Sequence, residues 1–204
     1  MSLAIHNLNP LLKELNDALL LEDAAPVDWI VCGGTALALQ GIGTRSTRDV
    51  DVLGNWMPQE LQIVAIGIFP PAVERAIARV AEAHSELLEI GSRWVNLGPQ
   101  EIVKCGLPER FAERLTAMRI GDRLTLHLLG RIDLIALKLY AAADDMGSRQ
   151  QIHLDDLRLF EPTAEEINRA IHWVQRMPDP HHRIRPSLRN IVKELGHEDL
   201  AYYI

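Results

Sequence analysis

Residues 27–53 read VDWIVCGGTALALQGIGTRSTRDVDVL and decide which fold we expect for the chain. The first six residues have β-type composition and end at a pair of glycines, and the apolar residues that follow have helical spacing. After two further glycines, polar and apolar residues alternate as they do in a half-buried strand. The stretch predicts a strand, a glycine turn, a short helix, and a second strand that carries Asp49 and Asp51 and ends at Gly54 and Asn55.

Asp49 and Asp51 should point to the same face of their strand, because successive side chains alternate between the two faces. Their backbones would lie roughly 7 Å apart, and like charges this close repel one another unless a cation lies between them. Mg²⁺ prefers carboxylate oxygens, and a pair of Mg²⁺ ions can clamp the attacking and leaving oxygens in phosphoryl transfer. We therefore expect Asp49 and Asp51 to be catalytic metal ligands for two Mg²⁺ ions, with Mn²⁺ as an alternative.

The glycine turn and its neighbours have the features of a phosphate site. Gly33 and Gly34 lack Cβ atoms, so a ligand can approach their backbone closely, and the helix that follows offers free N–H groups. Thr35 adds a hydroxyl group, while Arg45 and Arg48 lie near enough in sequence to neutralise phosphate charge. We expect these five residues to bind the triphosphate of a nucleotide. The alternative, an ordinary turn before a strand, explains each feature alone but not all of them in this order.

The composition of the whole chain is that of a folded globular protein. It has 204 residues, 48% of them hydrophobic, which is enough for one sizeable core. A net charge of -7 argues against a protein that coats nucleic acid with a broad basic face. Cys32 and Cys105 are far apart, which indicates neither a disulfide framework nor a zinc site of closely spaced ligands. Because no export signal or membrane span is visible either, we expect a cytoplasmic protein without membrane contact.

The rest of the chain falls into a mixed part and a helical part. Four segments are patterned in the first part, with helical spacing at 10–22 and 71–88 and strand-like spacing at 93–97 and 123–129. Beyond residue 130 the patterned segments are helical, and Thr163 followed by Glu166 is typical of a capping box. We predict an α+β fold, with a mixed sheet flanked by helices in residues 1–129 and a helical subdomain in residues 130–204 that packs on this core.

These motifs resemble the signature of the nucleotidyltransferase superfamily, which is an apolar strand, a Gly-Gly or Gly-Ser turn, a short helix and an acidic pair on the next strand. The matching stretches are VCGGT (31–35) and DVDV (49–52), with a spacing at the long end of that pattern. A closer resemblance, to small bacterial nucleotidyltransferases that include abortive-infection toxins of toxin–antitoxin systems, is carried by GGTALALQG (33–41), RSTRDVDVL (45–53), LIALKLYA (134–141) and HLDDL (153–157).

The resemblance implies a nucleotidyltransferase fold and the transfer of a nucleoside monophosphate from an NTP to an acceptor, with release of pyrophosphate. It implies that Asp49 and Asp51 bind metal and that the helical part closes over the nucleotide. It also suggests a phosphate contact for Lys138, for which a lysine stem at the edge of the core is an equal alternative.

The same resemblance implies a third carboxylate from a neighbouring strand. Our candidate strand is 93–97, and Asn96 stands where the acid is expected. An amide oxygen can ligate Mg²⁺, but it brings no charge and cannot act as a general base. Glu89 and Glu101 are the alternative sources of the third carboxylate.

The sequence leaves the acceptor and the partners open. RNA, a protein hydroxyl and a small alcohol are alternatives for the acceptor, and an antitoxin-like protein is an alternative partner. Without a third carboxylate, the chain would be a catalytically impaired relative that binds nucleotide or serves in a toxin–antitoxin pair. The stretch HHRIRPSLR (181–189) is the one concentrated basic segment, and it could contact RNA, contact an acidic partner, or form an ordinary helix start.

Overall fold

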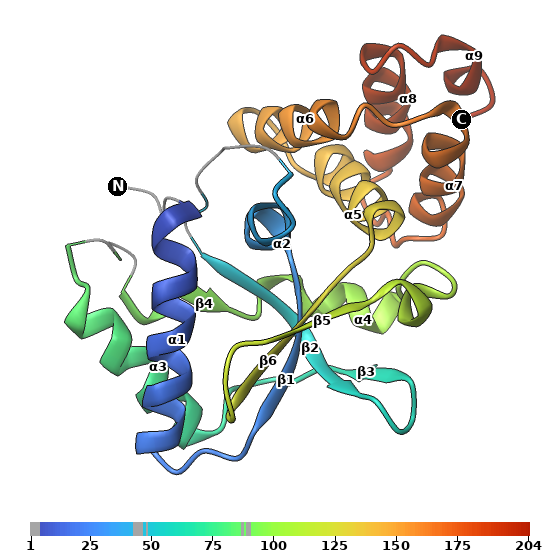
Figure 1. Cartoon of the computed structure of the whole chain (residues 1–204). Coiled ribbons are helices and arrows are strands. Elements are labelled where there is room, and N and C mark those ends of the chain that lie inside the picture. Colours follow the sequence, from blue (N-terminus) through green and yellow to red (C-terminus); the bar gives the residue numbers. More distant parts are fainter. Residues whose placement is uncertain (1–4, 43–46, 48, 87, 89–90) are drawn as a thin grey trace. The chain divides into compact units, whose positions relative to one another are not determined.

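The structure is a computed structural model that describes residues 5–42, 47, 49–86, 88 and 91–204. The chain divides into two compact units, of which the first comprises Met1–Gly106 with Arg110–Leu129 and the second Leu107–Glu109 with Gly130–Ile204. The first unit contains the β-sheet, and the second is helical (Figure 1). The predicted α+β class is confirmed, while the packing of the helical part on the core stays a prediction.

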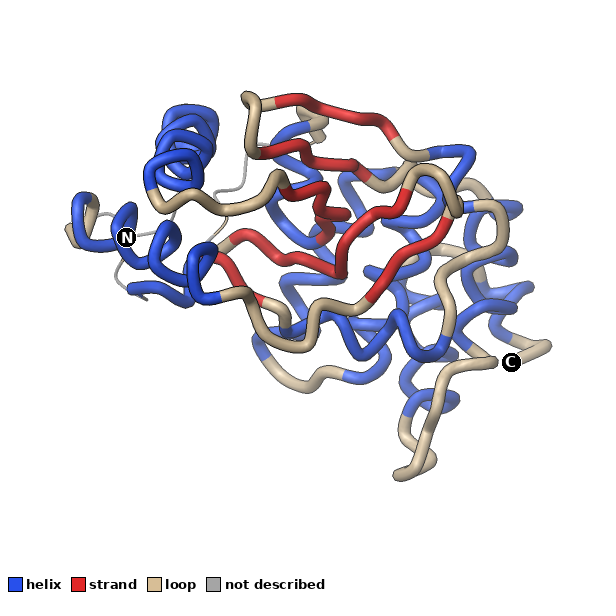
Figure 2. The backbone as a smooth tube through the Cα atoms, turned by 90° about the horizontal axis from the view of Figure 1, so that it is seen from below, coloured by secondary structure: helices blue, strands red, loops and turns tan. Residues whose placement is uncertain are grey.

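A mixed six-stranded sheet forms the centre of the first unit (Figure 2). Its order is β3-β2-β1-β6-β5, and β4 pairs with β2 off this path. The strands are β1 (Val27–Cys32), β2 (Val50–Met57), β3 (Gln62–Val64), β4 (Val95–Asn96), β5 (Thr116–Arg119) and β6 (Leu124–Leu128). The central strand β1 runs antiparallel to β2 and parallel to β6. This arrangement puts the two strands from the 27–53 stretch side by side.

The first unit also contains several helical segments. They are α1 (Ile5–Leu21), α2 (Gly33–Leu39), α3 (Pro71–Ala83), α4 (Glu101–Cys105) and the 3₁₀ segments η1 (Gly91–Trp94), η2 (Gly98–Gln100) and η3 (Phe111–Arg114). Helices α1 and α3 lie side by side (Figure 1), and Leu12, Leu15 and Leu19 of α1 are fully buried. Each such leucine contributes about 1.5–3 kcal/mol through the hydrophobic effect. Trp94 is also fully buried, and its Nε1 donates a hydrogen bond to the Ile77 carbonyl oxygen at 3.1 Å.

Strand β2 is longer than its alternating pattern predicts. The prediction that it ends at Gly54 and Asn55 is wrong, because β2 continues to Met57 and pairs with β3. Gly54 permits this pairing, since a Cβ atom at that position would lie 2.5 Å from the Val64 carbonyl oxygen. Here glycine allows a neighbouring backbone to approach closely and does not end the strand.

The second unit is built around α5. Its helices are α5 (Arg131–Asp144), α6 (Ser148–Phe160), α7 (Ala164–Val174), α8 (Ile184–Glu194) and α9 (Glu198–Ala201). Helix α5 packs against α6, α7 and α8. The predicted capping box at Thr163 is confirmed, since Glu166 N donates to Thr163 Oγ1 and Thr163 N donates to the Glu166 carboxylate. Among the described helices of both units, none is long and apolar enough to cross a membrane.

Candidate functional site

Asp49, Asp51 and Asn96 come together at the start of β2. Asp49 directly precedes β2, so the prediction that the strand carries both aspartates is wrong for this residue. Asp51 is the second residue of β2, and Asn96 is the last residue of β4. The two strands run parallel, and their register places Asn96 opposite Asp51. Asn96 Nδ2 lies 3.2 Å from Asp49 Oδ2 and 3.1 Å from Asp51 Oδ1. The two carboxylates therefore converge on one nitrogen atom.

A β-bulge decides which face of the sheet Asp51 occupies. The register of β1 and β2 pairs Ile30 with Gly54 but Cys32 with Asp51, so β2 has one extra residue between the two pairs. Since Ile30 and Cys32 lie on the same face of β1, Gly54 and Asp51 also share a face. Without the extra residue, alternation would turn Asp51 to the opposite face.

The Asn96 amide is oriented by Gly98. Gly98 N donates a hydrogen bond to Asn96 Oδ1 at 2.9 Å, which leaves the Nδ2 hydrogens for the two carboxylates. The NH₂ group puts partial positive charge between the Asp49 and Asp51 carboxylates. It thereby reduces their repulsion, as a bound cation would. In this orientation Asn96 is a hydrogen-bond donor, and its oxygen could ligate a metal only after the amide turns over. The role of Asn96 as a metal ligand stays a prediction.

Gly33 and Gly34 begin α2 directly after β1, so the turn predicted between strand and helix is absent, and Gly33 lies against the acidic pair. Its φ is +65°, and a Cβ atom at this position would lie 2.0 Å from Asp51 Oδ2. A side chain here would be strained by the left-handed backbone, and it would force the Asp51 carboxylate to move. The β1–β2 register explains the contact, because the residue before Gly33 pairs with Asp51. The glycine pair and the aspartates therefore form one site.

Thr35 fixes the backbone that carries Asp49. Its side chain is fully buried, and its Oγ1 donates a hydrogen bond to the Asp49 carbonyl oxygen at 2.6 Å. Thr47 Oγ1 donates to the same oxygen at 3.0 Å. The Thr35 hydroxyl thus positions the acidic pair, a role that the sequence did not reveal because the two residues are far apart in the chain. A contact between Thr35 and a triphosphate stays a prediction.

The other residues predicted for this site are Arg45, Arg48, Glu89 and Glu101. Arg45, Arg48 and Glu89 lie outside the described residues. Glu101 is exposed on α4, and its carboxylate lies 2.7 Å from the ammonium group of a lysine on the same helix. Over the ranges that the structure describes, no group of three or more His, Cys, Asp or Glu side chains could hold a metal ion. Glu101 therefore does not complete the acidic pair. The side chain that lies beside the pair is the amide of Asn96.

Lys138 lies in the helical unit, within a charged cluster of α5 and α6. Its Nζ is 2.6 Å from Asp156 Oδ2, and the two side chains are only 7% and 1% exposed. The ammonium group is therefore buried, not carried to solvent at the core edge. His153 Nε2 lies 3.1 Å from Asp145 Oδ2, and the pKa of His153 is lowered, first by burial and then by the Lys138 charge. The predicted contact between Lys138 and a phosphate stays a prediction.

Residues 6–157 match the model of a protein family described as "Nucleotidyltransferase of unknown function (DUF6036)". The match covers most of the chain and includes the glycine pair, both aspartates, Asn96 and Lys138. The chain belongs to this family. No curated protein and no solved structure has significant similarity to it.

Membership of this nucleotidyltransferase family confirms the resemblance to the superfamily, whereas the resemblance to abortive-infection toxins stays a prediction. The family match ends at residue 157, before α7, α8 and α9 begin. The last three helices of the chain therefore lie outside the segment that defines the family.

Proposed function

We propose that the protein is a metal-dependent nucleotidyltransferase that transfers a nucleoside monophosphate from an NTP to an acceptor. The observation that carries the proposal is the convergence of Asp49 and Asp51 on one nitrogen atom beside Gly33. Family membership supports the class of reaction, and this convergence supports the choice of residues. In the reaction, an acceptor oxygen forms a bond to the α-phosphorus while the bond to pyrophosphate breaks. Because NTPs are cytoplasmic metabolites, we expect the protein to act in the cytoplasm.

Asp49 and Asp51 would hold the metal. Their oxygens are the hard ligands that suit Mg²⁺ or Mn²⁺, and both reach the single position that the Asn96 nitrogen takes. A bound Mg²⁺ would supply positive charge for the triphosphate and the leaving oxygen. The two carboxylates would hold one ion once the Asn96 NH₂ group moves from between them, and a second ion would draw on the substrate phosphates for its remaining ligands.

The glycine pair would receive the triphosphate. The space beside Gly33 that a Cβ atom would fill is taken by Asp51, so the phosphate oxygens would be bound by backbone N–H groups at the start of α2 and by the metal ion that Asp51 holds. Arg45 and Arg48 would neutralise the remaining charge by hydrogen bonds between charged groups.

An isosteric double variant, Asp49→Asn with Asp51→Asn, tests this proposal. A fluorescent NTP analogue should bind to the wild type in millimolar Mg²⁺, and the variant should lose at least about 10–100-fold in affinity, which is the effect of disturbing a metal site even at its outer shell. Asp28→Asn is a single-charge control, because it removes one carboxylate from β1 outside the pair. Equal affinity of the wild type and the double variant in Mg²⁺ would contradict the assignment.

The orientation of Asn96 favours a second function, that of a catalytically impaired relative. An amide nitrogen between the carboxylates brings no base for the acceptor proton. Such a protein would bind nucleotide without transfer, or serve in a toxin–antitoxin pair with an antitoxin-like partner. Pyrophosphate release, measured with RNA, protein and small alcohols as acceptors, separates the two functions. Release that depends on Asp49 and Asp51 would exclude the impaired relative, while retained nucleotide binding without release would favour it.

A further inference from the structure

The helical unit contains a pocket that takes no part in the candidate site. It has a volume of about 240 Å³, and all the residues that line it belong to the second unit. One side is formed by α7, and the other by α9 and the residues that directly follow it. The lining residues that matter for its chemistry are Asn168, Ile171, His172, Gln175, Leu200 and Tyr203.

Helix α7 brings polar groups to the edge of an apolar floor. Its buried side chains include three with helical spacing, so they form one strip along the helix: Ile167, Ile171 and Val174. The polar residues of the pocket follow these one position later and so form a second strip beside the first: Asn168, His172 and Gln175. Ile171 therefore lies at the floor of the pocket, and the polar strip runs along its margin.

The opposite wall of the pocket is held in place by contacts of α9. His197 Nε2 lies 3.1 Å from the Pro162 carbonyl oxygen, so the residue before α9 is tied to the segment before α7. Ala201 of α9 is fully buried, and Tyr203 N donates a hydrogen bond to the Leu200 carbonyl oxygen at 3.1 Å. These contacts fix Leu200 and Tyr203 across from the polar strip.

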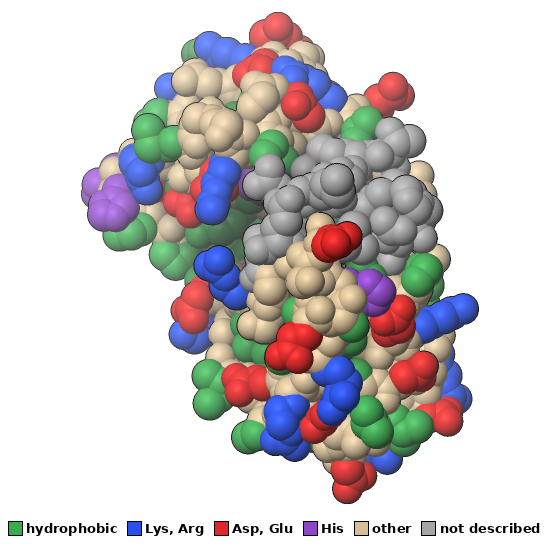
Figure 3. All heavy atoms as spheres, turned by 90° about the vertical axis from the view of Figure 1, so that its left-hand side faces the viewer, with side chains coloured by type: hydrophobic (Ala, Val, Ile, Leu, Met, Phe, Trp, Pro, Cys, Tyr) green, Lys and Arg blue, Asp and Glu red, His purple; other side chains and the backbone are tan. Residues whose placement is uncertain are grey.

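The polar strip has unused hydrogen-bonding capacity. Within the part of the chain that the structure describes, the side chains of Asn168, His172 and Gln175 have no hydrogen-bond partner. Each amide offers both a donor and an acceptor. The lining includes no Asp, Glu, Lys or Arg side chain, whereas acidic and basic side chains are interspersed on the face drawn in Figure 3. The pocket therefore suits a polar but uncharged group, and not a phosphate or a metal ion.

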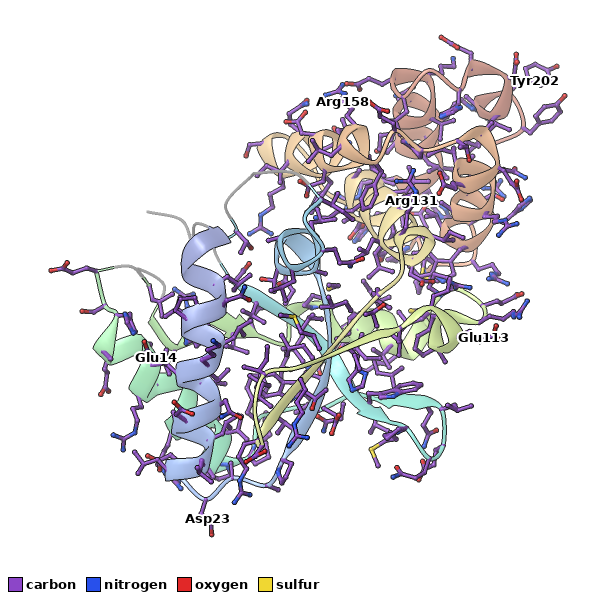
Figure 4. All side chains as sticks on the ribbon, in the orientation of Figure 1. Glu14, Asp23, Glu113, Arg131, Arg158 and Tyr202 are labelled. Atoms are coloured by element: carbon purple, nitrogen blue, oxygen red, sulfur yellow. The ribbon has the colours of Figure 1, made fainter. Side chains whose placement is uncertain are left out.

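Tyr203 adds an aromatic ring that is open for stacking. The side chains of Tyr202 and Tyr203 are 84% and 82% exposed, and their ring centroids lie 5.4 Å apart at an interplanar angle of 86°. Tyr202 projects from the surface of the helical unit (Figure 4). Because a perpendicular neighbour covers at most one face of a ring, at least one face of Tyr203 is available to a flat ligand.

The size and the chemistry of the pocket select a flat heterocycle. Pockets for drug-sized ligands measure about 300–1,000 Å³, so a pocket of about 240 Å³ suits a smaller group such as one ring system. Proteins recognise unpaired bases by stacking them on aromatic side chains and by hydrogen bonds to their edges. Asn and Gln amides match adenine in particular, because adenine presents the N6 donor beside the N7 acceptor. The pocket has two such amides, a stacking ring and an apolar floor.

We propose that this pocket binds an adenine base, with the ring stacked on Tyr203 and its edge bound by the amides of Asn168 and Gln175. The pocket lies beyond the family match, which ends at residue 157, and the proposal does not rest on nucleotidyl transfer at Asp49 and Asp51. The adenine belongs either to a free nucleoside or nucleotide or to a strand of RNA. The shared chemistry is the base, and the test separates the two sources.

Titration of the full chain with adenosine in EDTA, followed by NMR, tests the proposal. Adenosine has no phosphate and EDTA removes metal ions, so binding at the acidic pair through a metal-held triphosphate makes no contribution. The wild type should show saturable binding. Tyr203→Leu should weaken it by about 5–150-fold, the effect of losing one stacked base. The matched control is Tyr202→Leu, which removes an equally exposed ring outside the lining and should keep the wild-type affinity.

A second pair of variants tests the amides. Asn168→Ala with Gln175→Ala should weaken adenosine binding by about 5–150-fold, the effect of losing a bidentate contact. Asn190→Ala with Gln151→Ala is its control, since both side chains are exposed on other helices. Circular dichroism verifies that all variants fold.

The ligands separate the sources of the base and decide the proposal. Oligoadenylate RNA that binds more tightly than adenosine identifies a strand as the source, and equal affinity identifies a free nucleoside or nucleotide. The proposal is overturned if the wild type shows no saturable binding of adenosine, if uridine binds as tightly as adenosine, or if either variant binds like its control.

Discussion

Replacing Asn96 by aspartate should turn an attractive contact into a repulsive one. Asn96 Nδ2 now lies 3.2 Å from Asp49 Oδ2 and 3.1 Å from Asp51 Oδ1. Because the two side chains have nearly the same shape, the variant would put a carboxylate oxygen where the NH₂ group lies. Both hydrogen bonds would be lost, and a third negative charge would face the other two.

The geometry sets the expected size of the effect. Two unit charges about 3 Å apart repel by about 1.4 kcal/mol in water and by about 5 kcal/mol at an effective dielectric constant of 20. All three residues are only half-buried, so solvent screens the repulsion and the lower figure applies. Two such repulsions destabilise the variant by about 3 kcal/mol, which lowers the melting temperature by about 6–12 °C for a chain of this size.

Thermal unfolding in EDTA and in millimolar Mg²⁺ measures this effect. Mg²⁺ should restore most of the lost stability of Asn96→Asp, because three carboxylates hold a cation better than two and binding to the folded state stabilises it. The control Asn96→Ala loses the hydrogen bonds but adds no third carboxylate, so Mg²⁺ should stabilise it less than it stabilises Asn96→Asp. The reasoning is refuted if Asn96→Asp is as stable as the wild type in EDTA, or if Mg²⁺ stabilises all three proteins equally.

Three further variants probe the site and the helical unit by thermal unfolding. Gly33→Ala should be destabilised by about 2 kcal/mol or more, because φ is +65° and the new methyl group would lie 2.0 Å from a carboxylate oxygen. Lys138→Met should be destabilised by about 3–5 kcal/mol, since the buried Asp156 carboxylate would lose the ammonium group beside it. Glu166→Gln should be less stable than the wild type at pH 7, because the hydrogen bond from Arg131 lowers the pKa of Glu166. Stability from a lowered pKa is present above the unfolded value of about 4.3 and is lost as the pH falls through the folded value, so the two proteins should converge in acid.

Each of these variants has its own control. Gly41→Ala has a similar φ of +70° but no atom within 4 Å of the new methyl group, so equal losses at Gly33 and Gly41 would contradict the contact with Asp51. Combining Lys138→Met with Asp156→Leu should recover much of the stability, and a double variant no better than the single one would count against the buried pair. For Glu166→Gln, a stability difference that persists unchanged in acid would show that the ion pair is not its cause.

The sequence by itself determined the local structure of this protein. The β-type run 27–32, the helical spacing beyond residue 130 and the Thr163 capping box all depend on neighbouring residues, and the structure has each of them where the pattern predicts it. The predicted end of β2 at Gly54 was wrong because the role of this glycine depends on a strand that is not adjacent to it in sequence. A glycine is a local signal for a turn, but the close approach of β3 is a contact with another strand and cannot be seen in the pattern.

Only the tertiary structure decided how the candidate site is assembled. Alternation predicts that Asp49 and Asp51 share a face, but one extra residue in β2 decides which face of the sheet Asp51 occupies. The direction of the Asn96 amide depends on Gly98 N, and the position of Asp49 depends on the distant hydroxyl of Thr35. Periodicity reflects the geometry of one strand or helix, whereas strand register and hydrogen bonds between segments arise only when distant parts of the chain pack together.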